Sequence, residues 1–192
     1  MCLAASKVNY VWDDATANKW PAGKEDAPFG QMPLLLHQGS VIGQSQAIVR
    51  YCATMANLIP SNPIDAAKSD MVWTQAYEIF DAMVGAFYNA GGDEAKAAAW
   101  KTWMENTVTA KLAPLDKILA GRLFFGGDKP VAADVVLFAI MHLAHKAVAH
   151  VAGRSDWFKQ FPALAKNNAA LAMYGDIPKV VADGVDAYYK HP

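Results

Sequence analysis

A predicted strand start and a predicted helix start carry groups that could hold a small peptide between them. Met32-Pro33 precedes the apolar residues Leu34–Leu36, and this bond is a candidate cis peptide, because only proline makes that isomer inexpensive. A cis bond there would turn backbone N–H and C=O groups outward, where an extended peptide can pair with them. Gly43-Gln44-Ser45 leads into a predicted helix, and a helix N-terminus favours a carboxylate. The Ser45 hydroxyl and N–H could both bind it, so these segments predict a slot for a small peptide with a free carboxylate.

Cysteine and histidine side chains offer weaker candidates for chemistry. Cys2 lies near the start and Cys52 within a helical pattern, which favours reduced thiols in a reducing compartment over a disulfide. Cys2 could act as a nucleophile, but no charged partner is near it in the sequence. His142 and His145 are three apart, a spacing that can hold a metal ion, and His150 follows. No carboxylate or cysteine joins them at a fitting spacing, so we predict buried or pocket-lining histidines and no metal site.

Composition narrows the class of protein. The chain has 192 residues, 54% of them hydrophobic, with 17 Lys+Arg against 18 Asp+Glu and a formal net charge of −1. This balance argues against nucleic-acid binding. The longest apolar run, Val135 to Met141, is far shorter than the roughly 18 residues that a membrane span needs, and Met1–Ala5 is too short for a signal-peptide core. We therefore expect a cytoplasmic protein without a transmembrane segment.

The elements that would position the slot are short and broken by Gly and Pro. Two strands are predicted, at Val8–Trp12 and Pro33–Leu36, and a turn over Gln38–Ser40 leads into a return strand. Ser45 is predicted to cap the helix that follows with its hydroxyl. Further on, Ile59-Pro60-Ser61-Asn62-Pro63 contains two prolines, which forbid a continuous helix and indicate a linker.

Beyond the linker the apolar period changes to that of a helix. Ala132 to about His150 is apolar almost all round, which indicates a central helix buried by its neighbours. Trp100 and Trp103 are interpreted as core residues of an earlier helix. Further helices are expected over Asp156–Phe161, from Pro162 and from Ile177. The two amphipathic helices are predicted from the apolar positions Met71, Val72, Ala76, Ile79, Phe80, Met83, Trp100, Trp103, Met104, Val108, Leu112, Leu115 and Leu119.

Several segments together resemble sigma-class glutathione transferases, a family that includes glutathione-dependent prostaglandin D synthase and the cephalopod lens crystallins. The similar segments are 28–35 (PFGQMPLL), 43–51 (GQSQAIVRY), 119–128 (LAGRLFFGGD) and 133–134 (AD). The resemblance implies a thioredoxin-like α/β domain over 1–58, lacking its first strand, and an all-helical domain over 64–192. Asp134 would form hydrogen bonds at the start of the buried helix. The family usually has serine or threonine where this chain has Val131, so the capping box is incomplete and a weaker helix start is expected.

Residue by residue, the resemblance implies how glutathione would be held. Trp20 and Lys24 would hold its glycine end, Lys24 through the carboxylate. The backbone of Met32, before a cis Pro33, would pair with the cysteinyl residue, with Gln31 alongside. Taken singly, Trp20 could be only a packing residue and Lys24 only a solvated charge.

The resemblance also implies groups for the other end of glutathione and for a dimer. Gln44 and Ser45 would bind the γ-glutamyl carboxylate. Asp81 would reach across a homodimer to the γ-glutamyl amine of the neighbouring site, with Glu78 as the alternative and a merely solvated acid as another interpretation. Arg50 and Tyr51 are interpreted as structural.

The alignment implied by the resemblance places Met1 inside the family's first helix. The first strand and the catalytic tyrosine that follows it are therefore not found in this sequence, and no catalytic residue is assigned. Two functions follow as hypotheses. The first is a glutathione transferase or glutathione-dependent isomerase, acting on small electrophiles when a preceding segment supplies the tyrosine. The second is a non-catalytic structural or binding subunit of a larger assembly.

Overall fold

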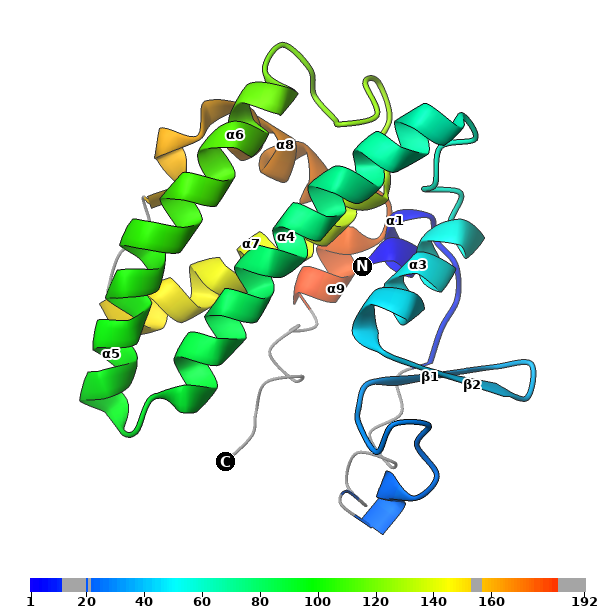
Figure 1. Cartoon of the computed structure of the whole chain (residues 1–192). Coiled ribbons are helices and arrows are strands. Elements are labelled where there is room, and N and C mark those ends of the chain that lie inside the picture. The colour runs from blue at the N-terminus through cyan, green and yellow to red at the C-terminus, as the bar shows by residue number, and fades with distance from the viewer. Residues whose placement is uncertain (12–19, 21, 153–156, 183–192) are drawn as a thin grey trace.

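The computed structural model of the chain describes residues 1–11, 20, 22–152 and 157–182. A small α/β part precedes a larger helical part, which fills most of the molecule (Figure 1). Among the described residues, no helix is both long and apolar enough to cross a membrane. The elements are α1 (Cys2–Ala5), η1 (Ala22–Lys24), β1 (Leu34–His37), β2 (Ser40–Gly43), α3 (Ser45–Met55), α4 (Pro63–Asn89), α5 (Asp93–Thr102), η2 (Trp103–Val108), α6 (Thr109–Leu119), α7 (Ala132–Ala152), η3 (Trp157–Gln160), α8 (Pro162–Leu171) and α9 (Ile177–Ala182).

The predicted hairpin is confirmed. Strands β1 and β2 pair antiparallel, from Leu34 opposite Gly43 to His37 opposite Ser40. The two turn residues, Gln38 and Gly39, have positive φ angles of 49° and 74°. Two-residue hairpin turns require this backbone conformation because it matches the twist of the strands. The Met32–Pro33 bond before β1 is cis, as predicted.

The predicted strand at Val8–Trp12 is wrong for Val8–Val11, and Trp12 lies outside the described residues. The chain reverses after α1, because Lys7 has a φ of 55° and the Val8 N–H donates to the Leu3 carbonyl at 2.8 Å. Val11 is then 92% exposed. The alternating apolar residues of this segment therefore do not form a strand, because a strand needs both a neighbouring strand to pair with and a buried face.

The predicted capping role of Ser45 is also wrong. Helix α3 starts with Ser45 as its first helical residue, and Gln44 is the cap, with φ 69° and no side-chain hydrogen bond to the helix. Gln44 takes the flanking position, and the Ser45 hydroxyl makes no hydrogen bond to the N–H groups of the helix. A cap must stand one residue before the helix to make such a bond.

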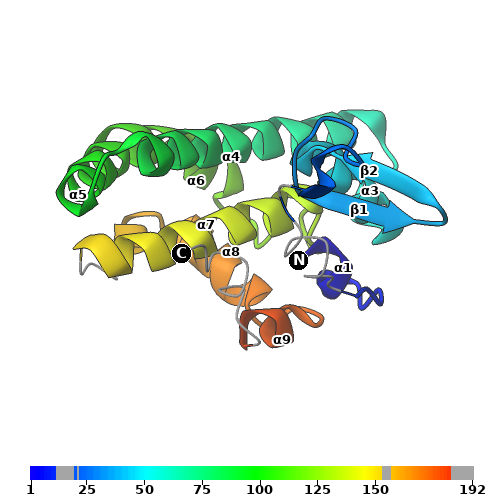
Figure 2. The same ribbon diagram turned by 90° about the horizontal axis from the view of Figure 1, so that it is seen from below.

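Helices α4 and α7 lie side by side in the helical part (Figure 2). Asn62 caps α4, where its side-chain oxygen accepts from the N–H groups of Ile64 and Asp65 at 2.9 and 3.3 Å. Pro63 follows as the first helical residue, a position where proline fits. The predicted burial of α7 is confirmed for its described side chains by nine almost fully buried apolar residues: Ala132, Ala133, Val135, Val136, Leu137, Phe138, Ile140, Met141 and Ala144.

Helices α5 and α6 form one helical run through the π-helical turn η2. The core interpretation of the two tryptophans is confirmed. Trp100 and Trp103 are 2% and 3% exposed, and their rings meet edge to face at 5.1 Å. The Trp103 indole N–H also donates to the Ile79 carbonyl of α4 at 3.3 Å, so its one polar group is satisfied inside the core.

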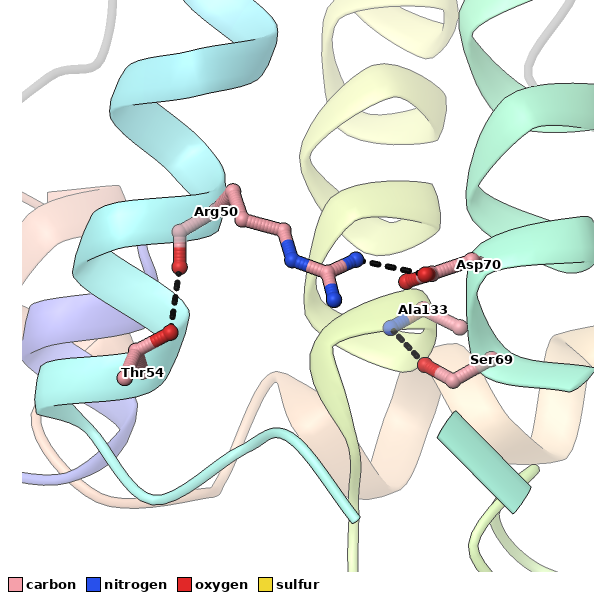
Figure 3. Close-up of polar contacts among 5 residues, drawn as sticks. All are labelled: Arg50, Thr54, Ser69, Asp70 and Ala133. Atoms are coloured by element: carbon pink, nitrogen blue, oxygen red, sulfur yellow. Dashed lines mark hydrogen bonds and ion pairs between the residues drawn. The ribbon is translucent and has the colours of Figure 1, made fainter. Parts of the chain in front are cut away.

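The start of α7 has a capping arrangement that spans two helices. Asp134 is fully buried, and its carboxylate accepts from the N–H groups of Phe125 and Val131 at 2.9 and 2.8 Å. The hydroxyl that Val131 cannot provide comes from Ser69 of α4, which accepts from the Ala133 N–H at 3.3 Å (Figure 3). The capping box is incomplete in the local sequence and is completed by a neighbouring helix.

The two parts are joined by main-chain hydrogen bonds at several points. The Ala132 N–H donates to the Leu58 carbonyl at 2.8 Å, and the Asp176 N–H donates to the Ala4 carbonyl at 2.9 Å. Consequently α1 and α9, from opposite ends of the described chain, lie next to each other (Figure 1). Gly175 allows this contact, because a Cβ there would lie 2.3 Å from the Ala5 carbonyl oxygen.

Candidate functional site

The loop before β1 and the start of α3 are joined by a pair of amide side chains. The Gln44 Nε2 atom donates to the Gln31 Oε1 atom at 3.2 Å, and both side chains are exposed. This contact brings Gln31 and Met32 next to the residues that lead into α3. The bond leaves the second side-chain N–H and the Oε1 atom of Gln44, and both side-chain N–H groups of Gln31, available to a ligand. Two of the predicted binding segments therefore meet at one exposed edge of the α/β part.

Ser45 presents polar groups at the N-terminus of α3. The first α-helical bond there runs from the Ile48 N–H to the Gln44 carbonyl at 3.0 Å, which leaves the preceding N–H groups without an intrahelical acceptor. Ser45 is half-buried, and its hydroxyl bonds no other residue in the described part of the chain. The arrangement can donate several hydrogen bonds to an anion, and the helix dipole favours the negative charge.

Lys24 provides a positive charge in the loop that precedes this edge. Its ammonium group lies 5.7 Å from the centre of the Trp20 ring, within the range of a cation–π contact. Lys24 is exposed and Trp20 is half-buried, so the ring supports the lysine while the charge stays accessible to an anionic ligand.

The aromatic ring of Phe29 lies against the hairpin. Phe29 is 66% exposed and lies against Gly43, where a Cβ would be 3.6 Å from the ring. Met32, 38% exposed, precedes the paired part of β1, and Pro33 is exposed as well. The main chain at Met32 lies beyond the ladder between β1 and β2, at the edge where the Gln31 and Gln44 side chains meet.

The two acids weighed for a role across a dimer have different surroundings. Glu78 forms an ion pair with Lys111 of α6. Asp81, one turn further along α4, is exposed and bonds no other residue within the described ranges. Of the two carboxylates, Asp81 is therefore the one that stays available to a group outside the chain.

The two thiols of the α/β part are buried, and the phenol of Tyr51 is hydrogen-bonded. Cys2 is 7% exposed, and burial raises the pKa of its thiol to about 11. Burial also raises the pKa of Cys52. A thiol with a raised pKa is a poor nucleophile at neutral pH. The Tyr51 hydroxyl lies 2.5 Å from Nδ1 of His37, which fits the structural role expected for Tyr51.

Two of the three histidines of α7, His142 and His145, have side chains that the structure describes. The described residues contain no group of three or more His, Cys, Asp or Glu placed to hold a metal ion. His142 is half-buried and its ring stacks on Phe138 at 6.0 Å with an interplanar angle of 18°. The side chain of His150 lies outside the described residues.

A polar cluster between α3 and α4 was missed by sequence reasoning. Arg50 bonds Asp70 at 2.5 Å (Figure 3) and lies 6.0 Å from the centre of the Trp73 ring. A hollow of about 370 Å³ adjoins these three residues. Asp70 Oδ1 and Trp73 Nε1 are buried and have no hydrogen-bond partner among the described residues. Buried polar groups are normally hydrogen-bonded. These two atoms could therefore still form hydrogen bonds with a neighbouring molecule at this hollow.

Comparisons with known proteins relate both parts of the chain to one family. The model of the glutathione S-transferase N-terminal domain matches residues 2–54, and that of the glutathione S-transferase C-terminal domain matches residues 77–180. Glutathione S-transferase 1 of Ascaris suum is 33% identical over 123 residues, which are 62% of this chain and 59% of that protein. Hematopoietic prostaglandin D synthase of Gallus gallus is 30% identical over 115 residues, 60% of this chain and 56% of that protein. These alignments span less than two thirds of either relative.

A crystallin match and one solved structure extend over more of the chain. S-crystallin SL11 of Nototodarus sloanii is 26% identical over 187 residues, covering 95% of this chain and 86% of that protein. The solved structure of a Pi-class glutathione S-transferase from Onchocerca volvulus superposes with a TM-score of 0.80 at 21% identity, covering 97% of this chain and 86% of that one. The structural likeness establishes a shared fold.

Proposed function

Because this chain belongs to the glutathione S-transferase family, we propose that its α/β part binds glutathione at the edge formed by Gln31, Met32, Gln44 and Ser45. The observation that carries the proposal is the bond between Gln31 and Gln44, which brings the main chain before β1 together with the N-terminus of α3. A peptide lying along this edge meets main-chain pairing groups and an anion site at once.

The charges of glutathione suit the proposed placement. The tripeptide carries a carboxylate at each end. One fits the N–H groups and hydroxyl at Ser45, and the other fits the ammonium of Lys24, which rests on Trp20. The cysteinyl residue would lie between them and pair with the main chain of Met32 beside cis Pro33. Charge-assisted hydrogen bonds at both ends would fix the peptide and set the position of its sulfur.

We further propose conjugation of glutathione to small electrophiles, or its use in an isomerisation, as the activity of the protein when a tyrosine segment stands before residue 1. Such reactions need the thiolate, which a nearby hydroxyl donor stabilises. Tyr51 is bonded to His37, and the Cys2 thiol is buried. The 192-residue chain alone should therefore position glutathione and turn over slowly. A cytoplasmic, reducing location fits the two free cysteines.

A non-catalytic structural subunit is the second candidate. It is favoured by the S-crystallin alignment, which covers 95% of this chain, and by the described sheet of only two strands. A strand edge left open can pair with another chain, as a subunit of a larger assembly would require.

We also propose a homodimer, because the family is usually dimeric and the hollow beside Arg50, Asp70 and Trp73 holds buried polar atoms without partners. Asp81 would then reach the γ-glutamyl amine bound to the partner copy. A monomeric mass by light scattering across micromolar concentrations would rule out the dimer and this role of Asp81.

Ser45→Ala tests the binding proposal. Titration calorimetry should show glutathione affinity reduced about tenfold or more, because a hydrogen bond to a charged group contributes roughly 1.5–3 kcal/mol. Ser61→Ala is the matched control, since Ser61 lies in the exposed linker. Absence of glutathione binding at millimolar concentration, or equal affinity in both variants, would contradict the site.

Activity is tested with three forms of the protein assayed at one concentration. These are the 192-residue chain, the chain preceded by a family-like strand with its tyrosine, and the same extension with phenylalanine. We expect turnover of a reactive aromatic electrophile to rise only with tyrosine. If the unextended chain is as fast as the tyrosine form, another group activates the thiol, and if none is active while all bind glutathione, the structural candidate is favoured.

A further inference from the structure

We propose that Cys2 and Cys52 form a redox modification site, at which glutathione disulfide oxidises the two thiols to a disulfide that fastens α1 to α3. Both cysteines are free thiols in this structure. Their side chains are buried, at 7% and 9% exposure, and belong to the same hydrophobic cluster. Neither lies at the proposed glutathione edge, so the inference stands apart from the proposed function.

The register of α1 against α3 places the two cysteines opposite each other. The two helices are in contact (Figure 1), and the Ser6 hydroxyl at the end of α1 donates to the Ala56 carbonyl at the end of α3 at 2.6 Å. Cys2 precedes Ser6 by four residues, and Cys52 precedes Ala56 by four. Residues four apart lie one above the other on a helix face. Each cysteine therefore lies one turn back on the face that carries this contact.

The electrostatics of the two thiols agree with this placement. Burial is the main cause of the raised pKa of Cys2, about 11, and the negative charge that Cys52 carries as a thiolate adds to it. Such an influence weakens with distance, so the two sulfur atoms are neighbours. Burial also raises the pKa of Cys52. Because thiols with a raised pKa are mostly protonated at neutral pH, the pair reacts slowly and stays reduced until glutathione disulfide accumulates.

Oxidation of the pair needs two exchange steps. Helix α1 has only four residues, and its local opening admits the oxidant to the buried thiols. The thiolate of one cysteine attacks a sulfur of glutathione disulfide, whose S–S bond breaks, and one glutathione leaves as a thiolate that takes up a proton. The other cysteine, as its thiolate, attacks the protein sulfur of this mixed disulfide and releases the second glutathione. The two protein thiols thus lose two electrons and two protons, and glutathione disulfide becomes two molecules of glutathione.

The bond between Cys2 and Cys52 would attach α1 to the helix whose N-terminus carries Ser45. It closes a loop from residue 2 to residue 52, and a cross-link over a long loop lowers the conformational entropy of the unfolded chain. Oxidation should therefore stabilise the folded protein, because the two thiols already face each other. We expect the urea midpoint to rise, and amide exchange to slow over residues 2–5 and 53–56 in the oxidised protein.

Equilibration of the full chain with mixtures of glutathione and glutathione disulfide, in buffer and in urea, tests the proposal. Mass spectrometry of peptides, after free thiols are blocked, measures the internal disulfide and the two mixed disulfides. Their ratio gives the effective concentration of one thiol at the other. We expect this concentration to be at least about tenfold higher in the folded protein than in the urea-unfolded chain, with Cys2 joined to Cys52 of the same chain.

A variant that moves the thiol along α1 is the matched control. Cys2→Ala combined with Ala4→Cys keeps two thiols, but Ala4 lies about 200° further round the helix and outside the cluster that holds Cys2 and Cys52. Folding of this variant should give no rise in effective concentration. An equal or lower effective concentration in the folded unchanged chain, mixed disulfides without an internal bond, or equal closure in the variant would overturn the proposal. If the variant fails to fold, the folded and unfolded forms of the unchanged chain decide alone.

Discussion

The N-termini of α7 and α3 differ in whether their polar groups have hydrogen-bond partners within the protein. At α7, the buried Asp134 accepts from two main-chain N–H groups and from the Asn167 amide at 2.8 Å, and Ser69 accepts a further N–H. At α3, Gln44 is the cap residue but makes no side-chain hydrogen bond to the helix. The hydroxyl of the half-buried Ser45 bonds no other residue in the described part of the chain. The polar groups at the start of α7 are therefore hydrogen-bonded within the protein, whereas the Ser45 hydroxyl at the start of α3 has no partner among the described residues.

The same contrast extends to the two parts of the chain. The helical part holds most of the buried apolar residues, while Leu36 and Val41 of the hairpin are 68% and 45% exposed. A part that encloses its own polar groups can act as a rigid support, and a part that leaves them open can bind. Substitutions in the helical part should therefore lower global stability, and those in the α/β part should act locally or on binding.

Asp134→Asn is expected to have the largest effect. The new amide group would direct N–H donors at the N–H groups of Phe125, Val131 or Asn167, and leave buried donors unpaired. We expect the free energy of unfolding to fall by about 2–3 kcal/mol, measured by chemical denaturation. Asp128→Asn, in the exposed loop nearby, should change it by less than about 0.5 kcal/mol. Equal small losses in the two variants would remove the contrast between the two helix starts.

Ser69→Ala should have an intermediate effect. Removing the hydroxyl that accepts from the Ala133 N–H should cost about 1 kcal/mol, the usual contribution of a helix cap. Adding Val131→Thr should recover part of this loss, because it returns a hydroxyl to the local capping position. Thermal and chemical unfolding of the single and double variants measure the recovery, and no difference between them would show that position 131 is unable to cap.

Tyr51→Phe should have the smallest effect on global stability, because it should act mainly on the hairpin. It removes the bond between His37 of β1 and Tyr51 of α3, worth about 0.5–1.5 kcal/mol. Hydrogen exchange should quicken at the amides of β1 and β2 while the amides of α7 keep their protection. His37→Phe should give the same change, and the double variant should add little. Faster exchange throughout α7 would mean that the two parts unfold together.

Most patterns that act over a few neighbouring residues were predicted correctly, with the cap at Ser45 as an exception, and several that need a distant partner were not. The hairpin followed from the turn at Gln38-Gly39, and α7 from its continuous apolar surface. The strand at Val8–Val11 was wrong, because alternating residues form a strand only where another strand pairs with them. The bond between Gln31 and Gln44 and the cluster of Arg50, Asp70 and Trp73 join separate elements, and no local pattern reveals such contacts.

The sequence by itself determined most of the elements and the family, through helical periodicity, proline and glycine positions and the segments around Pro33 and Ser45. The tertiary structure alone decided which polar groups are used and which are left open. Val131 lacks a hydroxyl in the sequence, yet the packing of α4 on α7 brings Ser69 to the Ala133 N–H. Hydrogen bonds and charges act over a few ångströms, so their partners are set by which elements pack together rather than by their order along the chain.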